Sequence, residues 1–159
     1  MDNPRHLRRA EKRFRRAQRR LSRNRQKAKR KVASTHQKVA RQRKDFLHKQ
    51  SHRIVQEHDL MAVEQLKVKN MIRNRRLSKS ISDAGWRMFI TYLSYKAARQ
   101  GKRLVQVPAH GTSQTCICGA DVPKTLAIRL HECEECGLVQ DRDIVSAQVI
   151  LQRALNIVA

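Results

Sequence analysis

The sequence predicts a mixed α/β protein in which long basic helices precede two short strands and a cysteine-rich insert, with a helix closing the chain. Three observations support this fold class. The N-terminal third is rich in helix-forming residues and has neither glycine nor proline after Pro4. Two short β-prone runs, residues 60–63 and 103–108, lie on either side of an amphipathic stretch. Four cysteines follow the second run as two close pairs.

The charge of the chain points to a polyanionic partner. At 159 residues the chain is long enough for one domain with a buried core. It has 36 Lys and Arg against 13 Asp and Glu, and the resulting charge of +23 repels itself unless an anionic partner neutralises it. We therefore expect DNA or RNA as the partner. Aromatic residues make up only 4% of the chain, which favours contacts with the phosphate backbone over base stacking.

The sequence contains no run of 18 apolar residues, no signal-peptide core and no lipidation motif. We expect a cytoplasmic protein with no membrane partner. In that reducing compartment two close cysteine pairs indicate metal ligands rather than disulfides.

Residues 1–44 carry 19 of the 36 basic side chains and have a helical backbone propensity. Their few apolar residues recur three or four positions apart, which gives one narrow stripe on a cationic helix. The stripe consists of Leu7, Ala10, Phe14, Ala17 and Leu21. One interpretation is a helix that follows nucleic-acid phosphates, and the other is a solvated charged face or a partly disordered arm. The candidate phosphate contacts are Arg8, Arg9, Arg13, Arg16, Arg20 and Arg23.

A second long helix is predicted over residues 32–57. Its candidate buried positions are Val32, Val39, Phe46, Ile54 and Val55. His58 and Asp59 interrupt the helical pattern. The apolar run 60–63 that follows has the length of a buried strand, and Glu64 stands at its C-terminal end.

Residues 67–79 are polar, basic and rich in asparagine, and we expect a loop there. The loop adds the candidate nucleic-acid contacts Lys67, Lys69, Arg73 and Arg75. Ser82 and Asp83 are suited to cap the next helix, which Gly101 ends and which we expect to pack on a sheet. Its apolar positions are Trp86, Phe89, Ile90, Leu93 and Ala97. The second strand is predicted at residues 103–108.

The chain closes with a helix predicted over residues 143–158. Its apolar residues recur three and four positions apart, and we expect these side chains to face the core. They are Ile144, Ala147, Leu151, Leu155 and Val158. The sequence shows no internal repeat.

The two cysteine pairs, Cys116 with Cys118 and Cys133 with Cys136, are separated by fourteen residues. This spacing lets two turns meet and offer four thiolates tetrahedrally to Zn²⁺, and the glycine after each pair suits the left-handed backbone of such turns. The first pair is C-x-C instead of C-x-x-C, which makes a tighter turn. Because four thiolates leave zinc no open position, we expect a structural ion. Four ordinary buried cysteines or a redox pair are the alternative. His131 offers a replacement ligand, although a surface histidine is the commoner interpretation.

Two acidic positions indicate a second kind of metal site. Glu64 ends a predicted strand, and Asp143 opens the last helix. If the two strands lie side by side, the side chains of Glu64 and Asp143 converge at one rim of the sheet. There they would hold Mg²⁺, which orients a scissile phosphate. The alternative is that Asp141 and Asp143 cap the helix and stabilise its positive N-terminal dipole.

Five motifs occur in order along the chain: MAVEQLKVKNMIRN, ISDAGW, TSQTCICG, HECEECG and DRDIVSAQVIL. In this combination the chain resembles, over residues 3–155, the C-terminal part of the TnpB (OrfB) proteins of insertion sequences, which are relatives of the type V CRISPR effector nucleases. The resemblance implies a partial RNase H-like (RuvC-like) nuclease domain interrupted by a zinc ribbon. It also implies Mg²⁺ as a cofactor and DNA and a guide-like RNA as partners. By these motifs Glu64 is the second catalytic carboxylate and Asp143 the third.

The chain departs from the family pattern at several points. Family members carry a first catalytic aspartate on an opening strand upstream of the basic helices, and no residue here matches it by motif. The family sequence Glu-Asp-Leu is Glu64-Gln65-Leu66, and the asparagine after the third acid is Val145. Two-metal cleavage needs carboxylates that bridge both cations, so we expect this chain alone to be a poor or inactive nuclease. A second chain that supplies the missing strands is an expected partner.

The resemblance divides the chain into four regions. They are a basic helical region (1–58), a first part of the RuvC-like core (59–112), the zinc ribbon (113–140) and the C-terminal helix of the core (141–159). Two functions are open at this point: a fragment of an RNA-guided endonuclease that acts in transposition, or a non-catalytic zinc-ribbon remnant or regulator that binds nucleic acid. A basic ribosome-associated zinc-ribbon protein would fit the composition but leaves ISDAGW and DRD unexplained.

Overall fold

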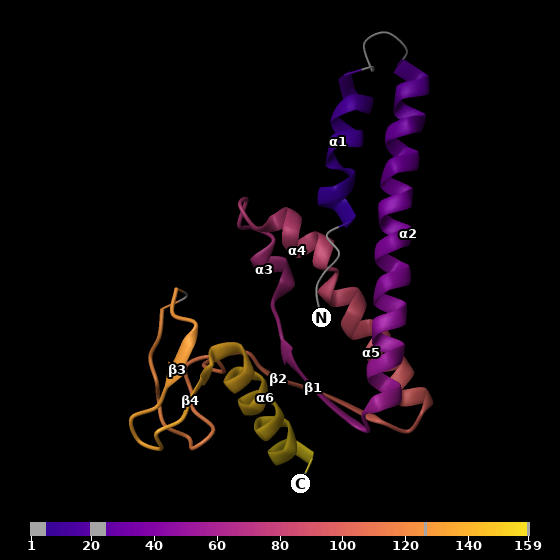
Figure 1. The fold of residues 1–159 in the computed structure, drawn as a ribbon. Helices are drawn as coiled ribbons and strands as arrows, with labels where there is room; N and C mark the ends of the chain where they lie inside the picture. The colour runs from indigo at the N-terminus through magenta and orange to yellow at the C-terminus, as the bar shows by residue number, and fades with distance from the viewer. Residues whose placement is uncertain (1–5, 20–24, 126, 159) are drawn as a thin grey trace. The chain divides into compact units, whose positions relative to one another are not determined.

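A computed structural model describes residues 6–19, 25–125 and 127–158, and among these the side chains of residues 6–9 and 19 are left out. The described chain is a mixed α/β structure that is mainly helical and has short strands (Figure 1). It forms two compact units, and each is discontinuous in sequence. The helical unit comprises Met1–Glu57 and Lys67–Gln100, and the sheet unit comprises His58–Leu66 and Gly101–Ala159. No described helix is long and apolar enough to cross a membrane.

The helical unit begins with two helices, α1 (His6–Arg19) and α2 (Arg25–Glu57), which pack side by side (Figure 1). Phe14 and Ala17 on α1 are 8% and 2% exposed, and the Phe14 ring lies 4.2 Å from the His36 ring on α2. The apolar stripe of the sequence thus lies, at Phe14 and Ala17, in the seam between the two helices. The interpretation of the basic face of α1 as a surface that follows phosphates stays a prediction. The side chain of Leu7 and the whole of Leu21 lie outside the described residues.

Helix α2 begins at Arg25, seven residues before the predicted start, because no glycine or proline interrupts the preceding helix-forming sequence. Of the predicted core positions Val39 and Val55 are buried, whereas Val32, Phe46 and Ile54 are half-buried. The buried residues of α2 are Ala28, Val39, Leu47, Ser51 and Val55.

The expectation of a loop over residues 67–79 was partly wrong. A single helical turn, α3 (Val68–Met71), opens this segment, and α4 (Ser78–Ala84) begins inside it. Asn74 provides the turn between them, because its backbone carbonyl accepts from the amides of Leu77 and Ser78. A polar composition predicts exposure, but it does not prevent short helices that need no apolar face.

Ser82 and Asp83 do not cap a helix, because both lie within α4. Asp83 is 5% exposed and forms an ion pair with Arg43 of α2, at 2.7 Å from the Nη2 atom. The break between α4 and α5 (Trp86–Arg99) is Gly85, which has a left-handed φ of 65°. A Cβ atom at this position would lie 2.9 Å from the Leu47 side chain, so glycine also allows the close approach to α2.

Helix α5 packs on α2 and not on a sheet, which corrects the second expectation for this region. Leu93 and Ala97 are buried, while Trp86, Phe89 and Ile90 are half-buried. The Tyr92 ring stacks on His48 of α2 at 3.9 Å, so polar aromatic side chains, which the apolar pattern ignored, form part of this interface.

The sheet unit is built on the two predicted strands, β1 (Leu60–Gln65) and β2 (Arg103–Pro108), which pair in parallel. The register pairs Leu60 with Arg103 and Glu64 with Val107. A second, antiparallel pair joins β3 (Leu130–Glu132) to β4 (Val139–Asp141), and β4 runs directly into α6 (Arg142–Val158).

Helix α6 packs on β1 and β2 with a face that the sequence analysis did not select. Its buried residues are Val145, Val149 and Ala154, whereas the predicted inward residues Ile144, Leu151 and Leu155 are 49%, 43% and 48% exposed. Ala147 is also exposed and Val158 half-buried. Both stripes have helical periodicity, so spacing alone could not choose between them, and the face with the smaller side chains lies against the strands.

Candidate metal centre and carboxylate site

The four cysteines form one cluster in the sheet unit. The sulfur atoms of Cys116, Cys118, Cys133 and Cys136 all lie within 4.8 Å of one another, and none is in a disulfide. Cys116 and Cys133 are buried, whereas Cys118 and Cys136 are exposed. No other His, Cys, Asp or Glu of the described residues joins a comparable group of three or more. The predicted ligand set is therefore brought together by the fold.

Each cysteine pair lies on a tight turn held by two backbone hydrogen bonds. The Cys116 amide donates to Ala120 O at 2.8 Å and the Gly119 amide to Cys116 O at 3.0 Å. In the second turn the Cys133 amide donates to Leu138 O and the Gly137 amide to Cys133 O, both at 2.9 Å. Gly119 and Gly137 have φ angles of 96° and 70°. The shorter C-x-C pair thus makes the same kind of turn as C-x-x-C, with one residue fewer.

The close approach of the four sulfur atoms, together with nearby backbone amides, shifts the pKa values of the cysteine thiols. Backbone amides, that of Cys136 first, lower the pKa of Cys133 to about 7. Although the Leu138 amide favours its thiolate, the neighbouring sulfurs and burial raise the pKa of Cys136 to about 12. Four thiolates this close repel one another, so a divalent cation that replaces the protons relieves the repulsion.

The sequence analysis favoured a surface position for His131. That expectation is wrong, because His131 is only 1% exposed. It is the inward residue of β3, between two exposed neighbours. The Lys124 ammonium group donates to its Nδ1 atom, and burial followed by the charge of Lys124 lowers the pKa of His131. His131 lies outside the sulfur cluster. Its contacts are those of a core residue of the cysteine-rich segment.

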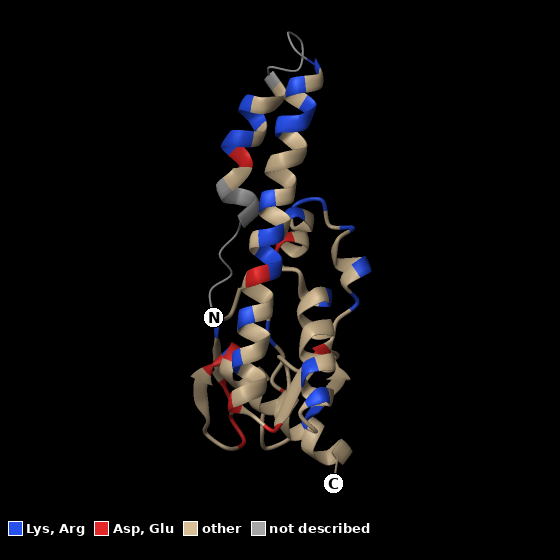
Figure 2. Cartoon of the chain, turned by 90° about the vertical axis from the view of Figure 1, so that its right-hand side faces the viewer, with Lys and Arg blue, Asp and Glu red and all other residues tan. Residues whose placement is uncertain are grey.

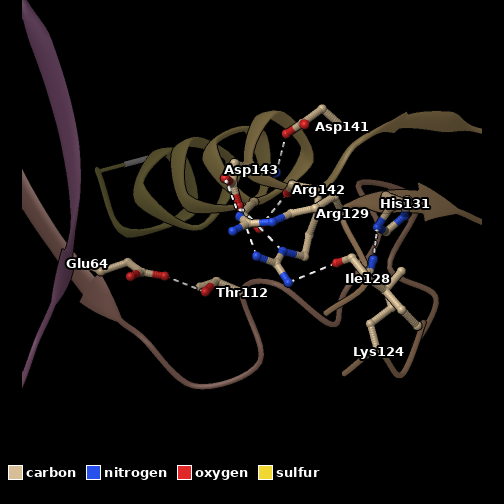
Figure 3. Close-up of polar contacts among 10 residues, drawn as sticks. Glu64, Thr112, Lys124, Ile128, Arg129, His131, Asp141, Arg142 and Asp143 are labelled. Atoms are coloured by element: carbon tan, nitrogen blue, oxygen red, sulfur yellow. Dashed lines mark hydrogen bonds and ion pairs between the residues drawn. The ribbon is translucent and has the colours of Figure 1, made fainter. Parts of the chain in front are cut away.

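Glu64 and Asp143, the predicted catalytic carboxylates, belong to the same unit. Glu64 is half-buried near the C-terminal end of β1, and the hydroxyl of Thr112 donates to its Oε1 atom (Figure 3). Asp143 lies in the first turn of α6, with its side chain 69% exposed. Since α6 packs on β1, the fold joins the two elements that carry these acids. Their convergence on one cation stays a prediction.

Two arginines meet the Asp143 carboxylate (Figure 3). Arg129 Nη1 lies 3.4 Å from Oδ2, and Arg142 Nε lies 3.4 Å from Oδ1. Arg142 also donates to the carbonyl of Ile128 at 2.9 Å, which ties the start of α6 to the cysteine-rich segment. Asp141 has the role that the alternative interpretation gave it, because its Oδ1 accepts from the Asp143 amide at 2.8 Å and so caps α6.

The predicted nucleic-acid contacts all belong to the helical unit. Arg13 and Arg16 on α1 are exposed, as are four further residues on and beside α3: Lys67, Lys69, Arg73 and Arg75. Arg8 and Arg9 lie in α1 with side chains outside the described residues, and Arg20 and Arg23 are outside them entirely. Figure 2 shows lysines and arginines along both α1 and α2.

Sequence reasoning missed three side chains that surround the carboxylates, namely Thr112, Arg129 and Arg142. Thr112 and Arg142 belong to the quoted motifs TSQTCICG and DRDIVSAQVIL, so the motifs were the available signal. The motif sequences do not indicate which carboxylate each of these side chains contacts.

Two family models cover most of the chain. Residues 1–75 match the OrfB_IS605 model, described as a probable transposase, and residues 86–150 match the model of the Cas12f1-like TNB domain. The second match contains all four cysteines, both strands of their segment and Asp143, while Glu64 lies in the first. The chain belongs to the TnpB/OrfB family. The resemblance stated from the motifs is therefore confirmed.

Individual relatives of this TnpB-family chain agree with the models. A Streptomyces pristinaespiralis protein named as an RNA-guided DNA endonuclease is 41% identical over 117 residues, which are 72% of this chain and 29% of that protein. The similarly named InsQ of Escherichia coli K12 is 33% identical over 129 residues, 70% of this chain and 32% of InsQ. The chain thus spans about a third or less of the length of these relatives.

A solved structure shares the fold. A chain from a cryo-EM structure of a Cas12f1–sgRNA–target DNA complex matches with a TM-score of 0.58 at 19% identity, over 91% of this chain and 41% of the other. At this identity the match concerns the fold alone.

Proposed function

We propose that this TnpB-family chain forms part of an RNA-guided DNA endonuclease of a transposable element. The helical unit binds the nucleic-acid backbone, and the sheet unit provides two carboxylates and a structural zinc ribbon. One observation carries the proposal: Glu64 and Asp143, assigned by motif, lie on β1 and α6, which pack together in one unit with the cysteine cluster. The proposed place of action is the cytoplasm.

The cysteine cluster fits zinc by its chemistry. Four sulfur donors within 4.8 Å of one another suit a soft, tetrahedral ion, and a complete thiolate set leaves no position for water or substrate. We assign the ion a structural role in residues 113–140. In the same proposal residues 1–58 are the basic helical region, and residues 59–112 and 141–159 are parts of a RuvC-like core.

The carboxylates fit Mg²⁺, a hard cation that prefers oxygen ligands. When bound, such an ion would polarise a phosphodiester and stabilise developing charge on its oxygens. Glu64 is suited to hold it in a fixed orientation because Thr112 restrains one carboxylate oxygen. Asp143 meets two arginines, so a cation must compete with Arg129 and Arg142 for the same oxygens.

The parallel pair β1 and β2 leaves both outer strand edges without a strand neighbour among the described residues. Such a small sheet gains stability from further strands. We propose that strands of a longer chain or of a second chain join it and complete the carboxylate set.

A second candidate function is nucleic-acid binding without cleavage. The observation that favours it is the pairing of Asp143 with two arginines, since an acid neutralised in this way is a weaker cation ligand. The basic surface and the cysteine cluster do not depend on that acid.

Cleavage of labelled DNA by the zinc-loaded protein, with Mg²⁺ and with RNA co-purified from the host, tests the two functions. The matched controls are Glu64→Ala and Asp143→Ala. The endonuclease proposal predicts that DNA is cleaved in the presence of a chain that supplies the further strands. Both substitutions should abolish this cleavage and leave nucleic-acid binding intact. Binding without cleavage under all these conditions would leave the binding function and reject the nuclease.

A further inference from the structure

Among the described residues, the hydroxyl of Thr112 is the one side-chain group that donates a hydrogen bond to the Glu64 carboxylate. Thr112 is 3% exposed, so it is a buried polar group and its hydroxyl needs a partner. Its second neighbour is the carbonyl of Ala109 at 3.3 Å, and the carboxylate is the closer of the two acceptors. A hydroxyl has one hydrogen, so it donates fully to only one of these two acceptors, and the closer one is the Glu64 carboxylate.

The segment that carries Thr112 is fastened to the helix that carries Asp143. Arg153 of α6 donates to the carbonyl of His110 at 2.7 Å and to that of Pro108 at 3.3 Å. The Thr115 hydroxyl donates back to Gly111 O at 2.9 Å. The turn between β2 and the cysteine-rich segment is thereby restrained on both sides of Thr112.

We infer that Thr112 is a positioning residue, which orients the Glu64 carboxylate for a divalent cation. This inference rests on the proposed function, in which Glu64 is a metal ligand. The hydroxyl binds Oε1 and leaves Oε2 free of that donor, so the carboxylate presents a defined oxygen (Figure 3). Partners that orient metal-binding side chains commonly raise metal affinity about 10- to 100-fold.

Mn²⁺ serves as a paramagnetic probe for the test. The zinc-loaded, ¹⁵N-labelled chain is titrated with Mn²⁺, and the broadening of the amide signals of residues 63–65 and 142–144 gives the dissociation constant. Thr112→Val keeps the shape of the side chain and removes the donor, whereas Thr112→Ser keeps the donor. Glu64→Gln removes the proposed ligand charge.

The expected result is a dissociation constant raised about 10-fold or more by Thr112→Val and restored by Thr112→Ser. Wild-type affinity in Thr112→Val, together with lost affinity in Glu64→Gln, overturns the role of Thr112 and leaves the proposed function standing. Wild-type affinity in Glu64→Gln overturns the proposed metal site itself.

A folding defect has its own readout. Thr112→Ala is the second hydroxyl-free variant, and it introduces no bulk. Loss of dispersed signals from residues 101–158 in both hydroxyl-free variants overturns the inference, because the hydroxyl would then serve the fold. An affinity loss that serine does not restore also overturns it, because the threonine methyl group would then be responsible.

Discussion

The helical unit and the sheet unit differ most in charge. The helical unit carries 30 Lys and Arg against five Asp and Glu, whereas the sheet unit carries six against eight. The net charge of the helical unit is thus +25 and that of the sheet unit, which has the cysteine cluster and the two carboxylates, is −2. The net charge of the whole chain, +23, hides this difference, which under the proposed function separates the binding of a polyanion from the holding of cations.

The two units are also held together differently. The helical unit relies on side chains that join helices, such as the ion pair of Arg43 with Asp83 and the contacts of Lys96 with His48 O and Ser51 Oγ at 2.6 and 2.8 Å. The sheet unit relies on backbone pairing and on the cysteine cluster. The four predictions below test whether this separation is real, starting with the largest expected effect.

Zinc removal should disorder the cysteine-rich segment and leave the helical unit folded. In small zinc modules binding of the ion contributes about 10–16 kcal/mol to folding, which is more than the short strand pair and small core of residues 113–140 can be expected to supply. Chelation, or Cys133→Ser, should make this segment sensitive to protease while α1, α2 and α5 keep their helical circular dichroism. Simultaneous loss of both signals would show that the units fold as one.

Breaking the ion pair of Arg43 and Asp83 should destabilise the helical unit. Asp83 is 5% exposed, so Arg43→Leu leaves a buried carboxylate without this counter-ion, a change that typically costs about 3–5 kcal/mol. Urea denaturation followed by circular dichroism measures the loss.

The matched control for that variant is Asp45→Asn, which breaks an exposed pair of the same helix with Lys49. Exposed pairs contribute about 0.2–1 kcal/mol. Equal effects of the two substitutions would contradict the assignment of the Arg43 pair as a structural link.

Replacing basic residues of the helical unit should weaken binding to duplex DNA and flatten its salt dependence. Each lost phosphate contact lowers the slope of log affinity against log salt by about 0.9. Arg13→Ala and Arg16→Ala on the exposed face of α1 are the test, measured by fluorescence anisotropy at several salt concentrations. Arg103→Ala, which removes an exposed charge from the sheet unit, is the control. An equal effect of that substitution would reject the assignment of DNA binding to the helical unit.

Mild acid should destabilise the helical unit slightly through His48. Burial, followed by the charges of Lys96 and Lys44, lowers the pKa of His48 below its usual 6.5. The unfolded chain therefore binds a proton first as the pH falls through 6.5, and the free energy of unfolding decreases from there down to the native pKa. His48→Gln should remove this part of the pH dependence in thermal melts between pH 7.5 and 5.5. An unchanged pH dependence would exclude His48 as its source.

The two units differ in how much of their structure can be predicted from the sequence. The cysteine set, β1 with Glu64 near its end, and β2 were predictable because ligand spacing and short apolar runs are local features. The partner of α5 and the buried face of α6 were not. An amphipathic helix has the same periodicity whether it faces a helix or a sheet, and α6 has two apolar stripes. Side chains that contact the acids from distant positions in the sequence, such as Thr112 and Arg129, depend on tertiary contacts that no spacing records.

The parallel pairing of β1 with β2 has a consequence for synthesis of the chain. Leu60 pairs with Arg103, which leaves the ribosome about 40 residues later. At roughly 5–20 residues per second, β1 is therefore synthesised about two to eight seconds before the strand with which it pairs. Helix α5 ends at Arg99, four residues before Arg103, so the helical unit is fully synthesised before β2 and the cysteine-rich segment that follows it. Under the proposed function, the basic unit is therefore complete and ready to meet RNA while the sheet unit is still being synthesised, before any carboxylate site exists.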